Sequence, residues 1–327
     1  MIKVAINGFG RIGRAFARLI YHKEIVSNID IVAINDLSDK EDLLYLFKYD
    51  SVYGKAKKEA VEKLSNAKFF SEKDPENLPW ANLGIDVVLE STGIFKTKEL
   101  AQKHIKAGAK NVVVSAPSSD IDMILVGIND EKLKDLNISS NASCTTNSVA
   151  LLLDLLHRNF EVEKAHLSTT HAYTSSQSLH DAISKKDPRR KRAGAINIIP
   201  TSTGAAKATA KVLSFLEGKF AGSALRVPVP SGSIAELFVL LSKKTDLEAI
   251  KQVIKDEASR ENNKFILSFT GEPVVSSDIL GEPVAGMVDL SQTELVDGDF
   301  LKVSVWYDNE YGYTASLIQH IIKTASN

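Results

Sequence analysis

The sequence of 327 residues contains a single cysteine, Cys144, so no disulfide can form within the chain. Because secreted proteins rely heavily on disulfides, this lack favours a cytoplasmic protein. No apolar run approaches the roughly 20 residues that span a bilayer. The first residues, MIKVAINGFGRIGR, also lack the order of basic, apolar and small residues that marks a signal peptide. We therefore expect neither secretion nor a membrane partner.

An excess of charge of one sign is also missing. The 40 Lys and Arg residues balance 41 Asp and Glu residues, and the net charge of −1 gives no field that attracts nucleic acid or an anionic membrane. One basic run, KKDPRRKR (185–192), lacks the aromatic side chains that accompany single-strand binding. We interpret it as a solvated or anion-facing loop. Separately, the sequence leads us to expect no metal site.

The first half of the chain alternates between two hydrophobic patterns, and the length predicts two domains. Apolar runs rich in β-branched residues predict buried strands at 2–8, 29–37, 84–93 and 110–118. Helical spacing predicts helices at 11–24, 39–50 and 96–109. This alternation is typical of parallel βαβ units with helices on both faces of a sheet.

The second half has a different pattern, with a strongly apolar helix predicted at 148–160. Antiparallel-looking strands are predicted at 164–177, 223–230, 233–243, 284–290 and 300–309, followed by an amphipathic helix at 314–326. These runs favour a second domain of the α+β class. The last helix is expected to pack back on the first domain.

Three glycines form a G-x-G-x-x-G motif between the first predicted strand and the first predicted helix. In that context Gly8 permits the tight turn, Gly10 lets the backbone approach a pyrophosphate, and Gly13 allows close packing of helix and strand. The helix start at Arg11 offers N–H groups and a positive dipole end to the anion. Asp36, after the second strand, is placed to bind ribose hydroxyls and to repel a 2′-phosphate, which favours NAD over NADP.

Cys144 lies in the polar stretch SNASCTTNS (140–148), outside any hydrophobic periodicity. The helix predicted after it would stabilise a thiolate, so we expect a lowered thiol pKa and a reactive sulfur. A free cysteine is alternatively a small buried hydrophobic residue. The spacing alone leaves both interpretations open.

A thiolate nucleophile is typically paired with an imidazole, and the chain has seven histidines. Five are predicted to be solvated, on helix surfaces or ends or in a polar loop: His22, His104, His157, His320 and His180. His166 and His171 lie five residues apart on one predicted strand and therefore point to opposite faces. The alternation does not say which of the two faces the cysteine.

Two segments have the chemistry of anion sites. TSTGAAKATAK (201–211) is a Ser/Thr/Gly turn before an alanine-rich helix, which suits a phosphate or simply caps the helix. Arg226 lies in an apolar strand, where a buried arginine needs an anionic partner. Together they suggest a phosphorylated substrate.

Six segments of the chain together resemble one known family. INGFGRIGR, SNASCTTN, THAYT, TSTGAAKA, RVPVP and WYDNEYGY occur in the order found in phosphorylating glyceraldehyde-3-phosphate dehydrogenases. The resemblance runs from residue 2 to about residue 320. It implies NAD as cofactor, glyceraldehyde 3-phosphate and inorganic phosphate as substrates, a role in glycolysis and a homotetramer. It also implies that Cys144 is the nucleophile and that His171, not His166, assists it.

The same resemblance implies the fold and the remaining site residues. The fold is an α/β Rossmann-type parallel-sheet domain (1–147 plus the C-terminal helix 313–327) and an α+β catalytic domain with a mostly antiparallel sheet (148–312). The cofactor positions are Gly8, Gly10, Arg11, Ile12, Gly13, Asp36, Lys73, Ser115, Asn309 and Tyr313. The substrate and phosphate positions are Ser143, Thr145, Thr174, Arg190, Thr203, Gly204 and Arg226. Asn309 matches the residue that holds the nicotinamide carboxamide, and Tyr313 matches the ring beside the nicotinamide.

Some positions depart from the family pattern. Lys73 stands where an arginine is common, and Ser148 replaces a second cysteine that the family often has. The segment 179–192 departs more, with Ile183 where the family often has a proline. This departure affects the assignment of Arg190 as a substrate-binding residue. It also affects how strictly NAD is preferred, so tolerance of NADP stays open.

Two alternative functions remain. The related erythrose-4-phosphate dehydrogenase uses water in place of phosphate, and the intact THAYTSSQ and TSTGAAKA segments favour the phosphate-dependent enzyme over it. A non-enzymatic binding role on the same fold is the other. The intact pair Cys144 and His171 argues against it.

Overall fold

The structure, a computed structural model, describes residues 1–22, 25, 28–183 and 187–326. The chain separates into two compact units, Met1–Ser143 with Thr314–Asn327, and Cys144–Tyr313. The end of the predicted helix 11–24 and the start of the basic run 185–192 lie outside the described residues.

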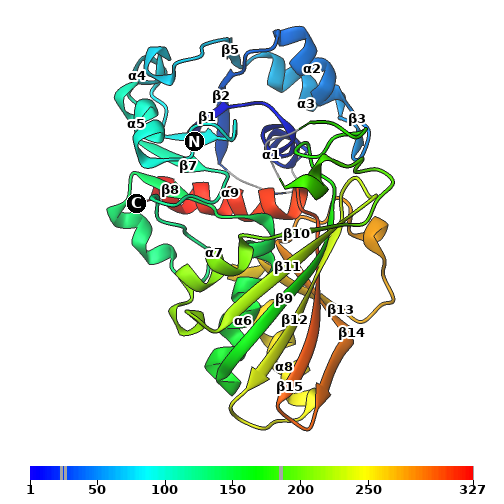
Figure 1. The fold of residues 1–327 in the computed structure, drawn as a ribbon. Helices are drawn as coiled ribbons and strands as arrows, with labels where there is room; N and C mark the ends of the chain where they lie inside the picture. The colour runs from blue at the N-terminus through cyan, green and yellow to red at the C-terminus, as the bar shows by residue number, and fades with distance from the viewer. Residues whose placement is uncertain (23–24, 26–27, 184–186, 327) are drawn as a thin grey trace. The chain divides into compact units, whose positions relative to one another are not determined.

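A six-stranded parallel sheet forms the centre of the first unit, in the order β5-β2-β1-β6-β7-β8 (Figure 1). Its strands are β1 (Ile2–Asn7), β2 (Ile29–Asn35), β5 (Lys68–Phe70), β6 (Val87–Glu90), β7 (Asn111–Val114) and β8 (Ile138–Ser140). This strand order is that of a doubly wound Rossmann sheet, whose ligands bind where the order reverses, beyond β1 and β6. The predicted parallel α/β class is therefore confirmed, although β5 and β8 are too short for their pattern to predict them.

Helices flank this sheet, and a small ribbon follows α2. They are α1 (Arg11–Tyr21), α2 (Lys40–Lys48), α3 (Lys58–Ser65), α4 (Trp80–Leu83), α5 (Lys98–Lys106) and the part of α9 (Tyr311–Ser326) from Thr314 onward; the ribbon is β3 (Tyr49–Asp50) and β4 (Gly54–Lys55). One core cluster joins Ala5 and Val88 of the sheet to Trp80 and Ala101. Burial of these apolar side chains holds the carboxyl ends of the strands in place.

The second unit contains a seven-stranded mixed sheet in the order β10-β11-β9-β12-β15-β14-β13. Its strands are β9 (Val162–Ala172), β10 (Ile199–Ser202), β11 (Phe220–Val227), β12 (Ser233–Leu241), β13 (Leu267–Thr270), β14 (Gly286–Val296) and β15 (Phe300–Tyr307). Four pairings are antiparallel, while β9/β11 and β13/β14 are parallel. This confirms the predicted, mostly antiparallel sheet.

Helices cover one face of that sheet. They are α6 (Cys144–Phe160), α7 (Ala205–Val212) and α8 (Leu247–Ala258), and α6 and α8 lie directly against the strands (Figure 1). Because α6 is apolar on nearly all sides, it is almost wholly buried. Strand β12 alternates between buried and half-buried residues along its whole length, so the opposite face of the sheet remains partly open.

The expected solvation of the helical histidines is wrong for two of them. His104 on α5 and His320 on α9 are both 0% exposed. Each lies on the packed side of its helix and finds hydrogen-bond partners there, which stabilises a buried polar group. His22 and His157 are half-buried, and His180 is exposed as expected.

Candidate active site and cofactor pocket

The glycine turn of the first unit has three different requirements at its three glycines. Gly8 has a φ of +91°, and a Cβ there would lie 2.7 Å from the backbone nitrogen of Thr92. A Cβ at Gly13 would lie 2.6 Å from the carbonyl oxygen of Gly8, so close packing of α1 on β1 needs glycine. At Gly10 a Cβ would meet no atom within 4 Å, because Gly10 faces an open pocket. These are the turn, packing and ligand-approach roles of the motif.

That pocket has a volume of about 430 Å³ and lies at the carboxyl ends of the parallel strands. Its lining comes from the ends of β1, β2 and β6 and the segment after β5: Asn7, Gly8, Gly10, Asn35, Asp36, Leu37, Glu72, Lys73, Ser91, Thr92, Ile94 and Phe95. The Asp36 carboxylate accepts hydrogen bonds from the N–H groups of Phe9 at 2.8 Å and Ser38 at 3.0 Å. These bonds fix Asp36 beside the glycine turn, where a ribose hydroxyl would be recognised.

The side chain of Arg11 has protein partners of its own. Its guanidinium forms a 2.5 Å ion pair with Asp50 and lies 5.5 Å from the centre of the Tyr53 ring. Burial opposes ionisation of Asp50, but the bonds from Arg11 and from the backbone outweigh it and lower the pKa of that carboxyl. What this position offers to a bound anion is therefore the backbone at the start of α1, where no described side chain caps the helix.

Three further cofactor positions lie at different places in the first unit. Lys73 is exposed and lines the pocket. Ile12 lies half-buried in the first turn of α1. Ser115 follows β7 directly, and its N–H donates to the Glu90 carbonyl at 2.9 Å.

In the second unit, Cys144 is the first residue of α6 and faces a histidine. Its Sγ lies 3.4 Å from Nε2 of His171, the second-last residue of β9. Two residues earlier, Ala142 has a φ of +55°, a strained conformation for a residue with a Cβ, in the turn that leads to the sulfur. His171 is buried and His166 exposed, so of these two strand residues His171 lies beside the cysteine.

Burial and nearby cations set the charges of this pair. Burial, then the charges of Arg226 and Arg190, lower the pKa of His171 to about 3. Burial raises the pKa of the Cys144 thiol, and Arg226 only partly opposes this. The lowered thiol pKa expected from the helix start alone is thus not found, because burial outweighs the favourable charges. Both shifts favour the neutral forms, a thiol beside an imidazole.

Arg226 lies beside His171 because of the register of the sheet. Strands β11 and β9 run parallel, and Arg226 is the partner of His171 in that pairing. Its Nη1 lies 2.5 Å from His171 Nδ1 and donates to the Ala172 carbonyl at 2.8 Å. The same carbonyl lies 2.7 Å from Nδ1, so this ring nitrogen faces both a donor, Arg226, and an acceptor, and its contacts are compatible with either neutral tautomer.

Arg190 is fixed near the same site by the next strand. Its Nε donates to Thr201 Oγ1 at 2.7 Å and its Nη2 to the Ser202 carbonyl at 3.3 Å, and both partners belong to β10. The charge of Arg190 is close enough to lower the pKa of both His171 and Arg226. Two guanidinium groups therefore lie near the thiol–imidazole pair, which suits anionic substrates.

Tyr307 is a site residue that the sequence patterns did not single out. Its hydroxyl lies 3.0 Å from Thr145 Oγ1 and 2.8 Å from Thr169 Oγ1. Its ring packs edge-on against His171, with centroids 5.8 Å apart. Tyr307 ends the alternating strand β15 and is 1% exposed, so only its place within WYDNEYGY hinted at a special role.

Only some of the remaining substrate positions lie in this cluster. Ser143 directly precedes Cys144. Thr174, two residues beyond β9, has its hydroxyl 2.9 Å from that of Ser176. Thr203 accepts from the N–H of Ala205 at 3.1 Å, and Gly204 precedes α7.

The two nicotinamide positions of the family also lie in the second unit. Asn309 is 7% exposed, and its Oδ1 accepts hydrogen bonds from Ser231 at 3.3 Å and Ser233 at 3.0 Å. These bonds fix which side of the amide carries the donors. Tyr313 is buried, and its N–H donates to the Asp308 carbonyl at 3.3 Å.

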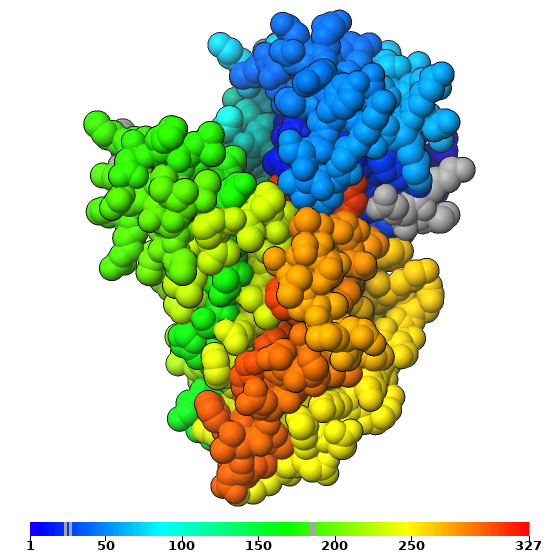
Figure 2. Space-filling view, turned by 90° about the vertical axis from the view of Figure 1, so that its right-hand side faces the viewer, coloured from blue at the N-terminus to red at the C-terminus, as the bar shows by residue number. Residues whose placement is uncertain are grey.

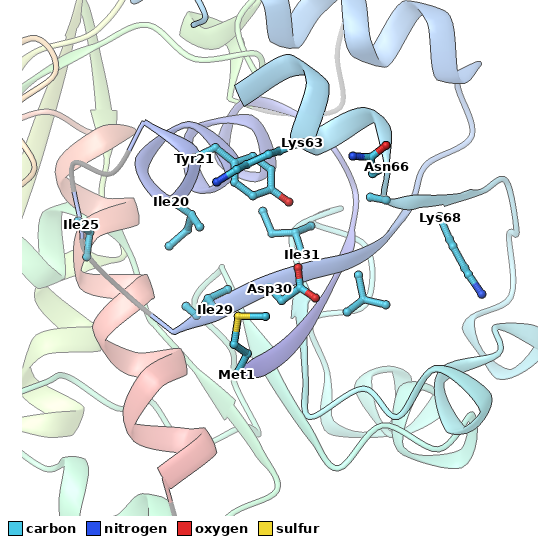
Figure 3. Close-up of a pocket in the computed structure, with 12 residues that line it drawn as sticks. Met1, Ile20, Tyr21, Ile25, Ile29, Asp30, Ile31, Lys63, Asn66 and Lys68 are labelled. Atoms are coloured by element: carbon cyan, nitrogen blue, oxygen red, sulfur yellow. The ribbon is translucent and has the colours of Figure 1, made fainter. Parts of the chain in front are cut away.

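Another cavity of the first unit, of about 880 Å³, lies at the opposite edge of the parallel sheet (Figure 3). Isoleucines of α1 and β2 line it, together with Lys63 and Lys68. Burial and then the Asp30 carboxylate raise the pKa of Tyr21, which stays a neutral phenol there. Because parallel sheets bind ligands at their carboxyl ends, this cavity is not the dinucleotide pocket.

Comparisons with known proteins agree with this arrangement. Residues 2–98 match the family model "Glyceraldehyde 3-phosphate dehydrogenase, NAD binding domain", and residues 143–309 match the corresponding C-terminal domain. Proteins named glyceraldehyde-3-phosphate dehydrogenase are similar over almost the whole chain. A Streptomyces avermitilis protein is 45% identical, covering 97% of this chain and 96% of its own. A Saccharomyces cerevisiae protein is 44% identical (99% and 100%), and one from Thermotoga maritima is 46% identical (97% and 97%).

Two features are absent from the residues that the structure describes. No helix among them is long and apolar enough to cross a membrane. In the same part of the chain, no group of three or more His, Cys, Asp or Glu side chains is arranged to hold a metal ion.

Proposed function

Because the chain belongs to the glyceraldehyde-3-phosphate dehydrogenase family, we propose that it oxidises glyceraldehyde 3-phosphate to 1,3-bisphosphoglycerate with NAD and inorganic phosphate. The observation that supports this most directly is the 3.4 Å contact between the only sulfur nucleophile, Cys144 Sγ, and His171 Nε2. A thiol beside a neutral imidazole is the arrangement that covalent catalysis through a thioester requires.

His171 acts as the base because its pKa, lowered to about 3, keeps the imidazole neutral at pH 7. As Cys144 attacks the aldehyde carbon, a carbon–sulfur bond forms, and the thiol proton passes by way of Nε2 to the aldehyde oxygen, which becomes a hydroxyl. His171 Nε2 then takes the proton of that hydroxyl as the carbon is oxidised to a thioester, a step for which bound NAD would supply the hydride acceptor. A phosphate oxygen then attacks the resulting thioester, the carbon–sulfur bond breaks, and the proton returns to the sulfur.

The first unit fits the cofactor. The open space beside Gly10, the start of α1 and the fixed carboxylate of Asp36 suit pyrophosphate and ribose. We assign Gly8, Gly13, Ile12, Lys73 and Ser115 to the same site, and Asn309 and Tyr313 to the nicotinamide. Asp36 would repel a 2′-phosphate, so kcat/KM is expected to be higher with NAD than with NADP.

The two guanidinium groups support two anion sites. Arg226 and Arg190 supply the positive charge, and Thr145, Thr174, Thr203, Gly204 and Ser143 supply hydroxyl and backbone groups. One site would hold the C3 phosphate of the substrate and the other inorganic phosphate. The charge that lowers the pKa of His171 is then neutralised when an anion binds, which raises the basicity of Nε2 as substrate arrives.

A homotetramer in the cytoplasm that acts in glycolysis is part of the same proposal. The described residues between β9 and β10, green in Figure 2, protrude from the second unit and expose Leu179, Ile183, Ile196 and Ile198. Exposed apolar side chains on one segment are typical of an interface. Light scattering of the purified chain tests the assembly: a monomer that is fully active would contradict it.

One experiment separates the proposed reaction from its alternatives. NAD reduction is measured with glyceraldehyde 3-phosphate, with and without phosphate, before and after one equivalent of iodoacetate. We expect phosphate-dependent turnover that disappears as one thiol per chain is alkylated. Turnover without phosphate would indicate the hydrolytic erythrose-4-phosphate type, and absence of turnover a binding role. Activity after full alkylation would exclude Cys144 as the nucleophile.

A further inference from the structure

Glu90 ends β6 next to the cofactor pocket, and it is 1% exposed. Its Oε2 accepts from Asn7 Nδ2 at 2.5 Å and lies 3.1 Å from His104 Nε2. Its Oε1 accepts from the N–H of Thr92 at 2.8 Å and from the hydroxyl of Thr92 at 2.5 Å. One buried carboxylate thus receives bonds from three different segments.

The imidazole of His104 is held in one neutral tautomer. Trp80 Nε1, which can only donate, lies 3.1 Å from His104 Nδ1, so Nδ1 is the acceptor. The ring proton is therefore on Nε2 and is donated to Glu90. A second proton on Nδ1 would point at the indole N–H, so the histidine gives Glu90 a hydrogen bond but no positive charge.

Two asparagines extend the network across the pocket. Asn7 Oδ1 accepts from Asn35 Nδ2 at 2.7 Å. Asn35 in turn accepts from the N–H of Glu72 at 2.8 Å and donates to the Glu72 carbonyl at 2.9 Å. Each amide has its donor side turned toward Glu90, so the carboxylate at one end of the network and the Glu72 backbone at the other fix the orientation of both side chains.

We propose that Glu90 is a positioning residue for the cofactor, because it orients the groups that form the pocket walls without being needed as a ligand. Asn7, Asn35, Glu72 and Thr92 line the pocket and come from the ends of β1 and β2 and the segments after β5 and β6. Asn7 and Thr92 bond directly to the carboxylate, and Asn35 and Glu72 are linked to it through Asn7. The inference rests on the proposed binding of NAD in this pocket.

Replacing the carboxylate by an amide of equal size breaks the pattern. In Glu90→Gln, either the Asn7 and His104 donors or the Thr92 N–H would face an amide N–H group. His104 cannot adapt, since Trp80 fixes its tautomer. Turning Asn7 over only passes the conflict to Asn35 and then to the backbone of Glu72. Wherever this series of rotations ends, one buried donor is left without an acceptor.

The experiment is calorimetric titration of the full-length protein with NAD and with ADP-ribose, which lacks the nicotinamide. We expect Glu90→Gln to lower the affinity for both ligands by about tenfold or more, and tenfold corresponds to about 1.4 kcal/mol of binding free energy. KM for NAD should rise in parallel, while kcat at saturating NAD and the iodoacetate rate of Cys144 stay within about twofold. Glu90→Asp, which keeps the charge but shortens the reach, should bind more tightly than Glu90→Gln.

The matched control is Glu257→Gln, another buried glutamate, which accepts from Asn263 in the second unit and should leave both affinities unchanged. Folded Glu90→Gln that binds both ligands like wild type would overturn the inference, as would equal losses in the control. If Glu90→Gln does not fold, Thr92→Val carries the same expectation, with Thr92→Ser close to wild type. Wild-type protein that binds no NAD would instead refute the proposed function.

Discussion

Each unit buries a histidine in a hydrogen-bonded cluster, and the two clusters differ in what faces the ring nitrogens. His104 lies between an indole N–H and a carboxylate, so both nitrogens have partners of fitting polarity. His171 lies between a thiol and an arginine, and its pKa falls to about 3. Burial alone therefore does not make a histidine reactive. A satisfied ring holds structure together, while a ring facing a nucleophile and a cation can take up a proton during a reaction.

Replacing each of the two histidines by glutamine should give the largest contrast in activity. His171→Gln removes the base, and we expect kcat to fall by roughly 10²–10⁴-fold. His104→Gln should leave the alkylation rate of Cys144 within about twofold and act instead on NAD affinity and stability. Steady-state kinetics and iodoacetate rates measure both. Equal losses of kcat in the two variants would contradict the distinction.

Removing the cation beside His171 should move its pKa upward. Burial, the larger cause, remains in Arg226→Gln, so the pKa should rise from about 3 but stay below 6.5. The thiol pKa should rise as well, because Arg226 favours the thiolate. Alkylation at neutral pH then slows by about tenfold per unit of thiol pKa. NMR titration of His171 and the pH dependence of alkylation measure the two shifts.

Arg260→Gln is the control for that charge change, since the exposed side chain of Arg260 pairs with Glu257 in the same unit. It should leave the His171 titration in place. A His171 pKa that does not move in Arg226→Gln would mean that burial alone lowers it.

Stability should depend on pH through the buried, neutral histidines. His320 donates to Asn141 and pairs with Ser139, and burial lowers its pKa to about 3. An unfolded histidine titrates near 6.5, so the unfolded state binds the proton first as the pH falls. The stabilisation is complete above pH 6.5 and is lost toward pH 3, by up to about 1.4 kcal/mol per pH unit per histidine.

Urea unfolding at pH 7 and pH 5 tests this dependence. His320→Gln should be less stable at pH 7 but should lose less stability on acidification than wild type. The exposed His180→Gln should retain the wild-type slope. An unchanged slope in His320→Gln would refute the assignment.

The smallest expected effect is at Tyr307, whose hydroxyl and ring contact residues of the reactive cluster. Tyr307→Phe removes the hydroxyl between Thr145 and Thr169, and we expect a loss of about 1–3 kcal/mol in unfolding free energy. Because the ring still packs on His171, kcat should fall less than about tenfold. Tyr45→Phe, at an exposed position, is the control. A complete loss of activity would make Tyr307 part of the chemistry instead.

Local patterns predicted those parts of the molecule that depend on local physics. The β-branched runs correspond to β1, β2, β6 and β7, and the glycine motif lies at the turn where it was expected. The burial of His104 was missed because its partners, Trp80 and Glu90, come from other segments, and a helical pattern shows no such pairing. Periodicity similarly left His166 and His171 equal, since the choice depends on which face α6 covers.

The reactive cluster was predictable only through resemblance. Arg226 lies beside His171 because β11 runs parallel to β9, whereas the sequence pattern suggested antiparallel strands. The rise in the Cys144 pKa likewise depends on burial by distant residues, while the helix start, a local feature, predicted the opposite.

The single cysteine has a consequence for oxidation. In many thiol enzymes a sulfenic acid condenses with a neighbouring cysteine, and the resulting disulfide protects the sulfur from further oxidation. Position 148, one helical turn beyond Cys144 on α6, is a serine in this chain. A sulfenic acid at Cys144 therefore cannot be captured as a disulfide within one chain, and that form of protection depends on a thiol supplied from outside it.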